Sequence, residues 1–278
     1  MYEEILYEVD EPVATISFNR PDRLNALTNR TMIELKHAFA HAEQDERAVG
    51  IILTGVGRGF SAGADMQSLG EIAAQGQING TDDLSEFKAT PGGKDADPEF
   101  KVTWGFIPGI RKPVIAAING PCAGMSFAIA TLCDIRFAAE SAKFTTSFSQ
   151  RGLIAEHGLS WTLPRLIGPS RALDLMWTSR KFDAVEAERL GLVDRVFPDN
   201  ELLPEARAYI ENLAKYCSPT SLMTMKRQVY LHLHRPLHEA LVESNELMGQ
   251  SVRREDFKEG VASFLEKRPP NFKPAKID

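Results

Sequence analysis

Two segments of this chain repeat one design, in which a buried strand runs into a loop of small residues and then into a helix. The first is AVGIILTG (48–55), followed by VGRGFSAGAD and a helix expected from about Ala64. The second is KPVIAAINGPCAG (112–124), followed by an apolar helix expected from Met125 to Leu132. Short strands alternating with helices over the first 150 residues predict an α/β fold, with a helical C-terminal appendage after them.

Other segments have clear local patterns. The alternation in PVATISFN (12–19) predicts a strand, and Thr28 is an expected N-cap of the helix that follows. Residues 134–146 suggest two short strands, and helical patterns dominate from Ser170 onward. Residues 76–98 carry Gly, Asp and Pro without periodicity, so we expect a mobile surface loop there.

Composition excludes several classes of protein. The 278 residues are 43% hydrophobic and 25% charged, an ordinary globular balance. The net charge of −6, without a Lys/Arg cluster, argues against a nucleic-acid surface. The three cysteines (Cys122, Cys133, Cys217) are too few and too scattered for a disulfide framework or a zinc site, which favours a reducing cytoplasm. The N-terminus has no signal-peptide pattern, and no apolar run of about 18 residues predicts a membrane span.

The two loops suggest a site for negative charge. A helix N-terminus exposes free backbone N–H groups, and small residues leave room in front of them. If adjacent strands bring the loops side by side, one amide from each can converge on one oxygen as an oxyanion hole, worth roughly 3 kcal/mol per donor. The alternatives are glycines that serve only tight turns, a dinucleotide loop in which Phe60 replaces the third glycine, and a nucleophile elbow at Ser126.

Further segments extend the pattern along nearly the whole chain. They are SFNRPDRLNAL, ILTGVGRGFSAGAD, KPVIAAINGPCAG, CDIRFAAESAKF, LPRLIGPSRALDLMWTSRKFDAVEAERLGLVDRVFP and EGVASFLEKRPPNF. In this order they resemble the crotonase (enoyl-CoA hydratase/isomerase) superfamily. The resemblance implies a crotonase-like spiral of ββα units, acyl-CoA ligands, and homotrimers often paired into hexamers. It divides the chain into a core with the CoA and active site (1–199) and a C-terminal helical trimerisation region (200–278).

The same resemblance implies roles for residues that match its motifs. Ala64 supplies one oxyanion N–H, and Met125 stands where the family has the second donor, commonly a glycine. The methionine side chain is expected to narrow or redirect the pocket. Ala62 and Ala64 lie along the CoA arm, and Arg23 is a candidate contact to the CoA phosphates.

Three more residues resemble family positions, each beside a structural alternative. Phe264 and Lys267 resemble residues that contact CoA, sometimes across a subunit boundary, although Lys267 alone fits a solvated surface charge equally well. Asp65 resembles an acid at the start of a helix and is expected to cap it, next to the CoA site.

The family's two catalytic glutamates have no counterpart here. By the motif counts they fall at Ala128 and Phe148, and neither residue can move a proton. Glu156 lies eight residues after Phe148 and twelve before Gly168, where dienoyl-CoA isomerases and 4-chlorobenzoyl-CoA dehalogenases of this superfamily carry a catalytic aspartate. An apolar surround would raise the pKa of Glu156 toward a useful range.

The surroundings of Glu156 leave alternatives open. A structural ion pair with Arg151 or Arg165 competes with a catalytic role. His157 either tunes Glu156 as a member of the site or is structural, because adjacent residues point in different directions. Trp161 is expected in the pocket wall or the core.

These observations predict an acyl-CoA enzyme of the enoyl-CoA hydratase/isomerase type. It would stabilise an enolate between Ala64 and Met125 while Glu156 moves a proton, with double-bond isomerisation favoured over hydration. The alternatives are hydrolase- or dehalogenase-like chemistry with Glu156 as nucleophile, and a catalytically silent acyl-CoA-binding subunit. No metal or redox cofactor is implied, and CoA arrives as part of the substrate.

Overall fold

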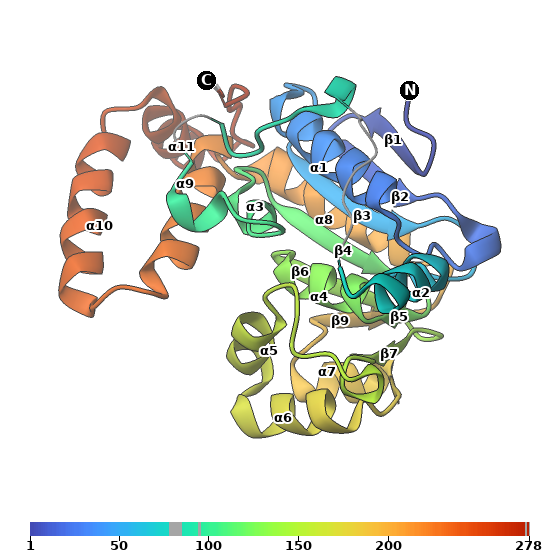
Figure 1. Cartoon of the computed structure of the whole chain (residues 1–278). Coiled ribbons are helices and arrows are strands. Elements are labelled where there is room, and N and C mark those ends of the chain that lie inside the picture. Colours follow the sequence, from blue (N-terminus) through green and yellow to red (C-terminus); the bar gives the residue numbers. More distant parts are fainter. Residues whose placement is uncertain (78–84, 94–95, 276, 278) are drawn as a thin grey trace.

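The computed structural model describes residues 1–77, 85–93, 96–275 and 277. Its main sheet has six strands in the order β1-β2-β3-β4-β6-β9 (Figure 1). The strands are β1 (Ile5–Asp10), β2 (Val13–Phe18), β3 (Gly50–Gly55), β4 (Val114–Ile118), β6 (Ile135–Ala139) and β9 (Arg195–Phe197). β1 runs antiparallel to β2, and every later pairing in this sheet is parallel. The α/β class expected from the sequence is confirmed.

Both faces of the central strands are buried, which explains their unbroken apolar sequences. Alternate residues face opposite sides, so Ile51 and Leu53 belong to one core and Ile52 to another. The larger core includes side chains of α1 (Asn29–Gln44) and α4 (Met125–Leu132). The second core is closed by α8 (Leu202–Tyr216), which buries Leu202, Ala206 and Ile210 against the sheet.

Local sequence signals set the helix starts on which the site depends. The Thr28 hydroxyl accepts the Thr31 N–H at 3.2 Å, and the Thr31 hydroxyl accepts the Thr28 N–H at 3.1 Å. The two bonds form a capping box at the start of α1. This confirms the expected cap. The helix after the first loop, α2 (Met66–Gln75), begins two residues later than expected, because Asp65 caps it.

A smaller sheet of β5 (Cys122–Ala123), β7 (Lys143–Thr145) and β8 (Phe182–Asp183) lies beside the main one. β5 pairs in parallel with β7, which brings the second glycine loop against the chain that leads to Glu156. The helices that follow are α5 (Leu159–Ile167), α6 (Pro169–Thr178) and α7 (Ala184–Leu190). α5 packs on both α4 and α6 (Figure 1).

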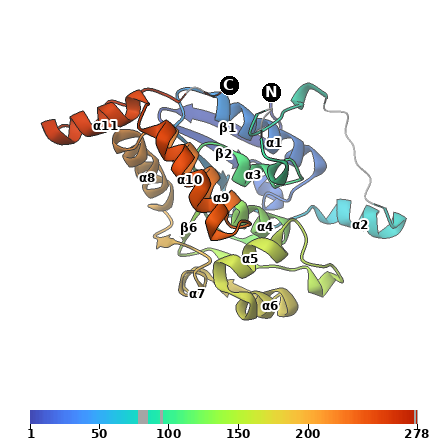
Figure 2. The same cartoon turned by 90° about the vertical axis from the view of Figure 1, so that its left-hand side faces the viewer.

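The chain ends in α9 (Pro219–His232), α10 (Leu237–Ser251) and α11 (Glu255–Glu266). α10 extends away from the sheet in Figure 1, and α11 extends away from it in Figure 2. No side chain of α10 is buried, and α10 and α11 expose large apolar side chains, among them Leu237, Leu241, Met248, Phe264 and Leu265. No helix in the described part of the chain is long and apolar enough to cross a membrane.

The segment 76–98, expected to be a mobile surface loop, is anchored where it can be described; residues 78–84 and 94–95 lie outside the described residues. It holds the short 3₁₀ turn η2 (Ser85–Phe87), and a second turn, η3 (Pro98–Phe100), begins at its last residue. The helix α3 (Phe106–Gly109) follows. The Phe87 ring is buried and stacks on Tyr2, with centroids 5.5 Å apart. The buried Glu43 carboxylate accepts the Gly92 N–H at 2.8 Å and the Arg111 N–H at 2.7 Å.

Candidate active site

The two glycine loops meet at the carboxyl ends of β3 and β4. The Ser61 N–H donates to the Pro121 carbonyl at 3.0 Å, and the Ala123 N–H donates to the Ser61 carbonyl at 3.1 Å. At Gly63 (φ +88°), an added Cβ would lie 2.5 Å from the Ala123 oxygen and 3.5 Å from the Met125 nitrogen. The close approach of the loops therefore requires glycine at position 63.

Ser126 joins the loops through a buried hydroxyl. Its Oγ lies 2.7 Å from the Ser61 oxygen and 2.9 Å from the Ala123 oxygen, and it accepts the Ala123 N–H at 3.1 Å. The hydroxyl is thus fully occupied by backbone groups and inaccessible, which argues against a nucleophile elbow at this position. Its structural role was not predicted from the sequence.

The loop geometry leaves two backbone amides free. Leu27 and Ala64 form an isolated β-bridge: the Leu27 N–H donates to the Gly63 carbonyl at 2.7 Å, and the Leu27 carbonyl accepts the Asp65 N–H at 2.9 Å. In this pattern the N–H of Ala64 itself points away from Leu27. Met125 is the first residue of α4 and has no intrahelical acceptor for its N–H. Within residues 1–77, 85–93 and 96–275, no acceptor binds either N–H. The two free donors match the requirement of an oxyanion hole.

The residues around these amides are held by further contacts. The Met125 side chain is half-buried and packs against the main core. Asp65 caps α2 by accepting the Gln67 N–H at 2.9 Å and pairs with Arg20 at 3.1 Å. Burial raises the pKa of Asp65, but the hydrogen bonds from Gln67 and Arg20 outweigh it and hold the pKa below its ordinary value. Asp65 therefore acts as the expected cap.

Ala128 and Phe148, the positions that the motif counts assign to the family's glutamates, are both apolar and buried. Ala128, in α4, has no exposed surface, and Phe148 is 6% exposed. Both belong to the main hydrophobic core. No proton-transferring side chain occupies either position.

Glu156 lies in the turn between Phe148 and α5, with its side chain 32% exposed. Its carboxylate Oε2 is 3.6 Å from Nε2 of His157, and the His157 ring lies 6.2 Å from the ring of Phe148. Burial lowers the pKa of His157, and the Glu156 charge opposes the shift only in part. The structure thus brings Phe148, Glu156 and His157 together.

The structural ion pair considered for Glu156 does not form. Arg151 donates to the Ser147 carbonyl at 2.8 Å, and Arg165 donates to the Trp161 carbonyl at 3.0 Å. Neither guanidinium pairs with Glu156 in the described part of the chain. Trp161 is half-buried in α5. The Arg165 guanidinium carbon lies 4.2 Å from the centroid of its ring, and the His234 ring stacks on it with centroids 5.3 Å apart.

A cluster of hydroxyl groups fixes the segment that carries Phe148. The Thr146 Oγ1 donates to the Leu175 carbonyl at 2.9 Å, and the Ser149 Oγ donates to the Trp177 carbonyl at 2.8 Å. Both hydroxyls also contact Ser179 Oγ, at 3.1 and 2.9 Å. The Leu175 carbonyl also accepts the Ser179 N–H at 3.0 Å, so Thr146 adds a second bond there, whereas Ser149 satisfies a carbonyl in the last turn of α6 that has no partner within the helix. Ser149 therefore helps to cap the end of α6.

The remaining predicted site residues fall into two groups. Arg23 is exposed at the end of the 3₁₀ turn η1 (Pro21–Arg23). It lies close to the first glycine loop, because the Ala62 N–H donates to the carbonyl of the next residue, Leu24, at 2.9 Å. Ala62 is also exposed. Phe264, 83% exposed, belongs to α11, and Lys267 is the C-cap of that helix. α11 lies on the opposite side of the chain from α2 in Figure 2. One chain alone does not bring Phe264 and Lys267 to the loops.

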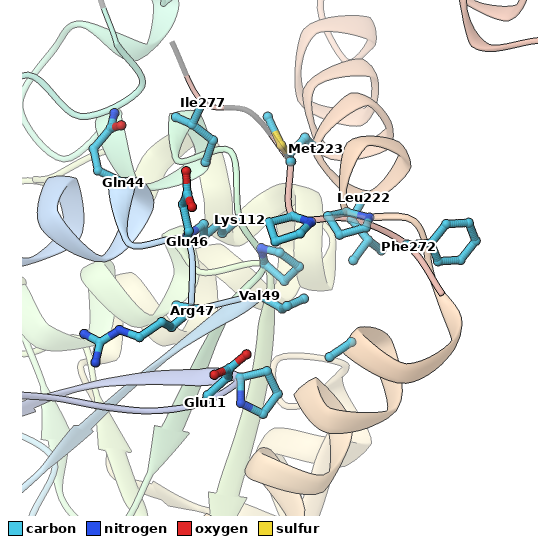
Figure 3. Close-up of a pocket in the computed structure, with 17 residues that line it drawn as sticks. Glu11, Gln44, Glu46, Arg47, Val49, Lys112, Leu222, Met223, Phe272 and Ile277 are labelled. Carbon is cyan, nitrogen blue, oxygen red and sulfur yellow. The ribbon is translucent and has the colours of Figure 1, made fainter. Parts of the chain in front are cut away.

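A cavity of about 280 Å³ lies elsewhere, at the amino ends of β3 and β4 (Figure 3). Val49 and Lys112 border it from the sheet, and Leu222 and Phe272 from the C-terminal part. The Lys112 Nζ donates to the Ala42 and Asp45 carbonyls at 3.0 and 2.6 Å, so it caps α1. The oxyanion candidates lie at the opposite ends of these strands.

Sequence comparison agrees with the geometry. Residues 8–275 match the family described as enoyl-CoA hydratase/isomerase. A Mycobacterium bovis protein named "Probable enoyl-CoA hydratase echA8" is 36% identical over 271 residues, which cover 98% of each chain. A Rhodobacter capsulatus protein named "Probable enoyl-CoA hydratase" is also 36% identical, with the same coverage.

Solved structures give the same result. An enoyl-CoA hydratase/isomerase from Mycobacterium paratuberculosis has a TM-score of 0.82 at 31% identity, covering 99% of this chain and 100% of that one. An enoyl-CoA hydratase from Bacillus anthracis has a TM-score of 0.83 at 29% identity, covering 98% and 100%. Fold and site define an acyl-CoA enzyme of the crotonase superfamily. The chain belongs to the enoyl-CoA hydratase/isomerase family.

Proposed function

We propose that this protein shifts the double bond of an enoyl-CoA ester, with Glu156 as the proton carrier. The observation that supports this is the partly exposed Glu156 carboxylate, 3.6 Å from His157, in a chain whose hydratase-glutamate positions by the motif counts hold Ala128 and Phe148. Hydration by the two-acid route needs one carboxyl to hold water and a second to deliver the α-proton. A double-bond shift needs one carboxylate, because the same group removes a proton at one carbon and returns it at another.

In the proposed reaction, the thioester carbonyl accepts hydrogen bonds from the N–H groups of Ala64 and Met125. Glu156 removes a proton from the substrate carbon, and the electron pair left behind moves toward the carbonyl oxygen as an enolate. The two amides bind this oxygen more tightly as its charge grows, which lowers the barrier. Return of the proton to a different carbon completes the shift without consuming water.

The proposed CoA contacts follow the same arrangement. Arg23, Ala62 and Asp65 border the loop at the first amide, and an exposed Arg23 suits a phosphate of CoA. Met125 and Phe148 would limit the acyl group, with Trp161 in the adjoining wall. The exposed apolar side chains of α10 and α11 support a homotrimer or a dimer of trimers, in which Phe264 and Lys267 reach the CoA of a neighbouring copy.

Two other functions compete with isomerisation. Glu156 as a nucleophile would form an acyl- or aryl-enzyme that water then cleaves. The absence of both usual glutamates also supports a catalytically silent acyl-CoA-binding subunit. Rapid quench followed by mass spectrometry distinguishes the nucleophilic mechanism from isomerisation, because only a nucleophile leaves a covalent adduct on Glu156.

The test is a mass-spectrometric screen of enoyl-, dienoyl-, hydroxyacyl- and aryl-CoA esters, run in deuterated water. Wild type is compared with Glu156→Gln, which keeps the side-chain shape and removes the base. We expect a shifted double bond in wild type and a loss of turnover of about 100- to 10,000-fold in the variant, the usual contribution of general acid–base catalysis. Unchanged turnover in Glu156→Gln would refute the role of Glu156. Tight binding of esters by both proteins, with none converted, would favour the silent subunit.

A further inference from the structure

Arg20 lies two residues after the end of β2, and its side chain contacts the first glycine loop. Its Nη1 donates to the Ala26 carbonyl and, at 3.1 Å, to the Asp65 carboxylate. Ala26 precedes Leu27 and Asp65 follows Ala64, the two residues that form the β-bridge beside the first candidate oxyanion amide. One nitrogen of Arg20 therefore joins the two segments on which the position of that amide depends.

The rest of the guanidinium is fixed by the chain that leads into β1. Its Nε lies 3.3 Å from one carboxylate oxygen of Glu4. The other oxygen of Glu4 accepts hydrogen bonds from the hydroxyls of Thr28 and Thr31, the capping box of α1. The side chains of Arg20, Glu4 and Asp65 are only 22, 19 and 15% exposed. Ion pairs this far removed from water are screened less by salt than exposed pairs, so they can hold a fixed geometry.

The direction of the Ala64 N–H depends on the segments that Arg20 joins. The peptide bond between Gly63 and Ala64 is planar and trans, so its N–H points opposite to the Gly63 carbonyl, which accepts the Leu27 N–H at 2.7 Å. The Leu27 carbonyl in turn accepts the Asp65 N–H at 2.9 Å, and Asp65 is the residue that Arg20 holds. Gly63 has no Cβ to restrict the rotation of this peptide, so these contacts must restrict it.

We propose that Arg20 is a positioning residue, which acts through Asp65 to hold the Ala64 N–H in the direction that binds the thioester oxygen. The inference rests on the proposed oxyanion role of Ala64 and does not depend on Glu156. Arg20 does not suit a CoA phosphate, the contact expected of Arg23, because its guanidinium already faces two carboxylates whose charges would repel a phosphate. A misdirected N–H would bind the developing enolate charge less well, so kcat should fall while KM changes little.

Two single variants break the same contact in different ways. Asp65→Asn removes the charge that pairs with Arg20 but keeps a side-chain oxygen that can cap α2. Arg20→Gln removes the cation, whereas Arg20→Lys keeps it on an ammonium that cannot reproduce the forked contacts of a guanidinium. The matched control is Arg30→Gln, because Arg30 is 23% exposed and pairs with Glu3 at 2.8 Å, at the start of α1 rather than at the loop.

The measurement is isotope-edited infrared spectroscopy of bound butyryl-CoA that carries ¹³C at its thioester carbonyl. Hydrogen bonds to this oxygen polarise the C=O bond and lower its stretching frequency. A saturated acyl group has no double bond to shift, so the readout requires no turnover. We expect wild type, Arg30→Gln and Glu156→Gln to lower the frequency equally. Arg20→Gln and Asp65→Asn should lower it less, with Arg20→Lys between them and wild type.

Turnover of the reacting CoA ester gives a second readout. We expect Arg20→Gln and Asp65→Asn to lower kcat by up to about 100- to 1,000-fold, the cost of one oxyanion donor. The double variant should be no slower than the slower single variant, because both substitutions remove one contact. Multiplied losses in the double variant would overturn the route through Asp65.

The infrared spectra decide the inference. Folded Arg20→Gln and Asp65→Asn that lower the carbonyl frequency as much as wild type would overturn it, and if Arg20→Gln does not fold, Asp65→Asn decides alone. A wild type that binds the ester without lowering its frequency would refute the oxyanion assignment and this inference together. Full turnover in Glu156→Gln would refute only the proton carrier, because the frequency measurement does not use Glu156.

Discussion

Replacement of Gly63 by alanine tests the oxyanion geometry most directly. The added Cβ would lie 2.5 Å from the Ala123 carbonyl oxygen, closer than any real contact permits, and that oxygen already accepts the Ser126 hydroxyl at 2.9 Å. The second loop must therefore move, and it carries the Met125 N–H with it. Position 63 also has φ +88°, which disfavours any residue with a Cβ.

The close contact and the left-handed backbone together set the expected loss of stability. A left-handed alanine costs about 1–2 kcal/mol, and overpacking a tight contact costs about 1–3 kcal/mol. We expect Gly63→Ala to lower the free energy of unfolding by about 2–5 kcal/mol, the sum of those terms. Displacement of one oxyanion donor lowers kcat by about 100- to 1,000-fold.

Urea unfolding and steady-state turnover of the reacting CoA ester measure the two effects. Gly70→Ala is the matched control, because it is the same substitution in the exposed part of α2 with nothing within 4 Å of the new Cβ. A glycine in a helix interior is less stable than alanine by roughly 0.5–1 kcal/mol, so the control should be unchanged in turnover and slightly stabilised. Wild-type kcat in folded Gly63→Ala would refute the assignment of these amides.

Three further predictions concern the groups that support the site. Ser126→Ala should lower the free energy of unfolding by about 1–3 kcal/mol, because buried backbone partners lose their hydrogen bonds, and urea midpoints will measure it. Glu43→Ala should cost about 3–5 kcal/mol and speed proteolysis near Gly92, whereas the exposed Glu46→Ala should do neither. Burial lowers the pKa of His37 and of His157 in the folded state, so at a pH below about 6.5 the unfolded chain binds more protons than the folded one. The free energy of unfolding should therefore fall as the pH drops below that value. Urea midpoints between pH 7.5 and 5.5 measure that fall, and a His37→Asn variant with an unchanged slope would contradict the contribution of His37.

Sequence reasoning succeeded where the signal is local. The Thr28 cap, the two buried strands and the start of α4 at Met125 all depend on residues within a few positions of each other. It did not predict β1, although Ile5, Tyr7 and Val9 alternate with Leu6 and Glu8, because this edge strand fully buries only Ile5 and its pattern is weak.

Long-range contacts could not be inferred in the same way. The Ser126 hydroxyl bonds a residue 65 positions away, and the Thr146 and Ser149 hydroxyls bond carbonyls of α6 that are 29 and 28 positions away. A serine or threonine in a loop has many potential acceptors, and only the tertiary fold selects one. Motif spacing made Glu156 a candidate, and that assignment stays a prediction. Its contact with His157 could not be inferred from spacing, because His157 has a left-handed backbone conformation.

Phe148 connects one of the positions that the motif counts assign to a family glutamate with the surroundings of His157. A glutamate at position 148 would place a charge in the main core, where an unpaired carboxylate is strongly disfavoured. Phenylalanine instead fills that space and packs toward the imidazole of His157, which lowers the polarity around it. The residue that removes one acid thus helps to keep the neighbouring imidazole neutral. On the predicted assignment, the apolar packing around Phe148 accounts both for the lack of an acid at this position and for the low polarity around His157.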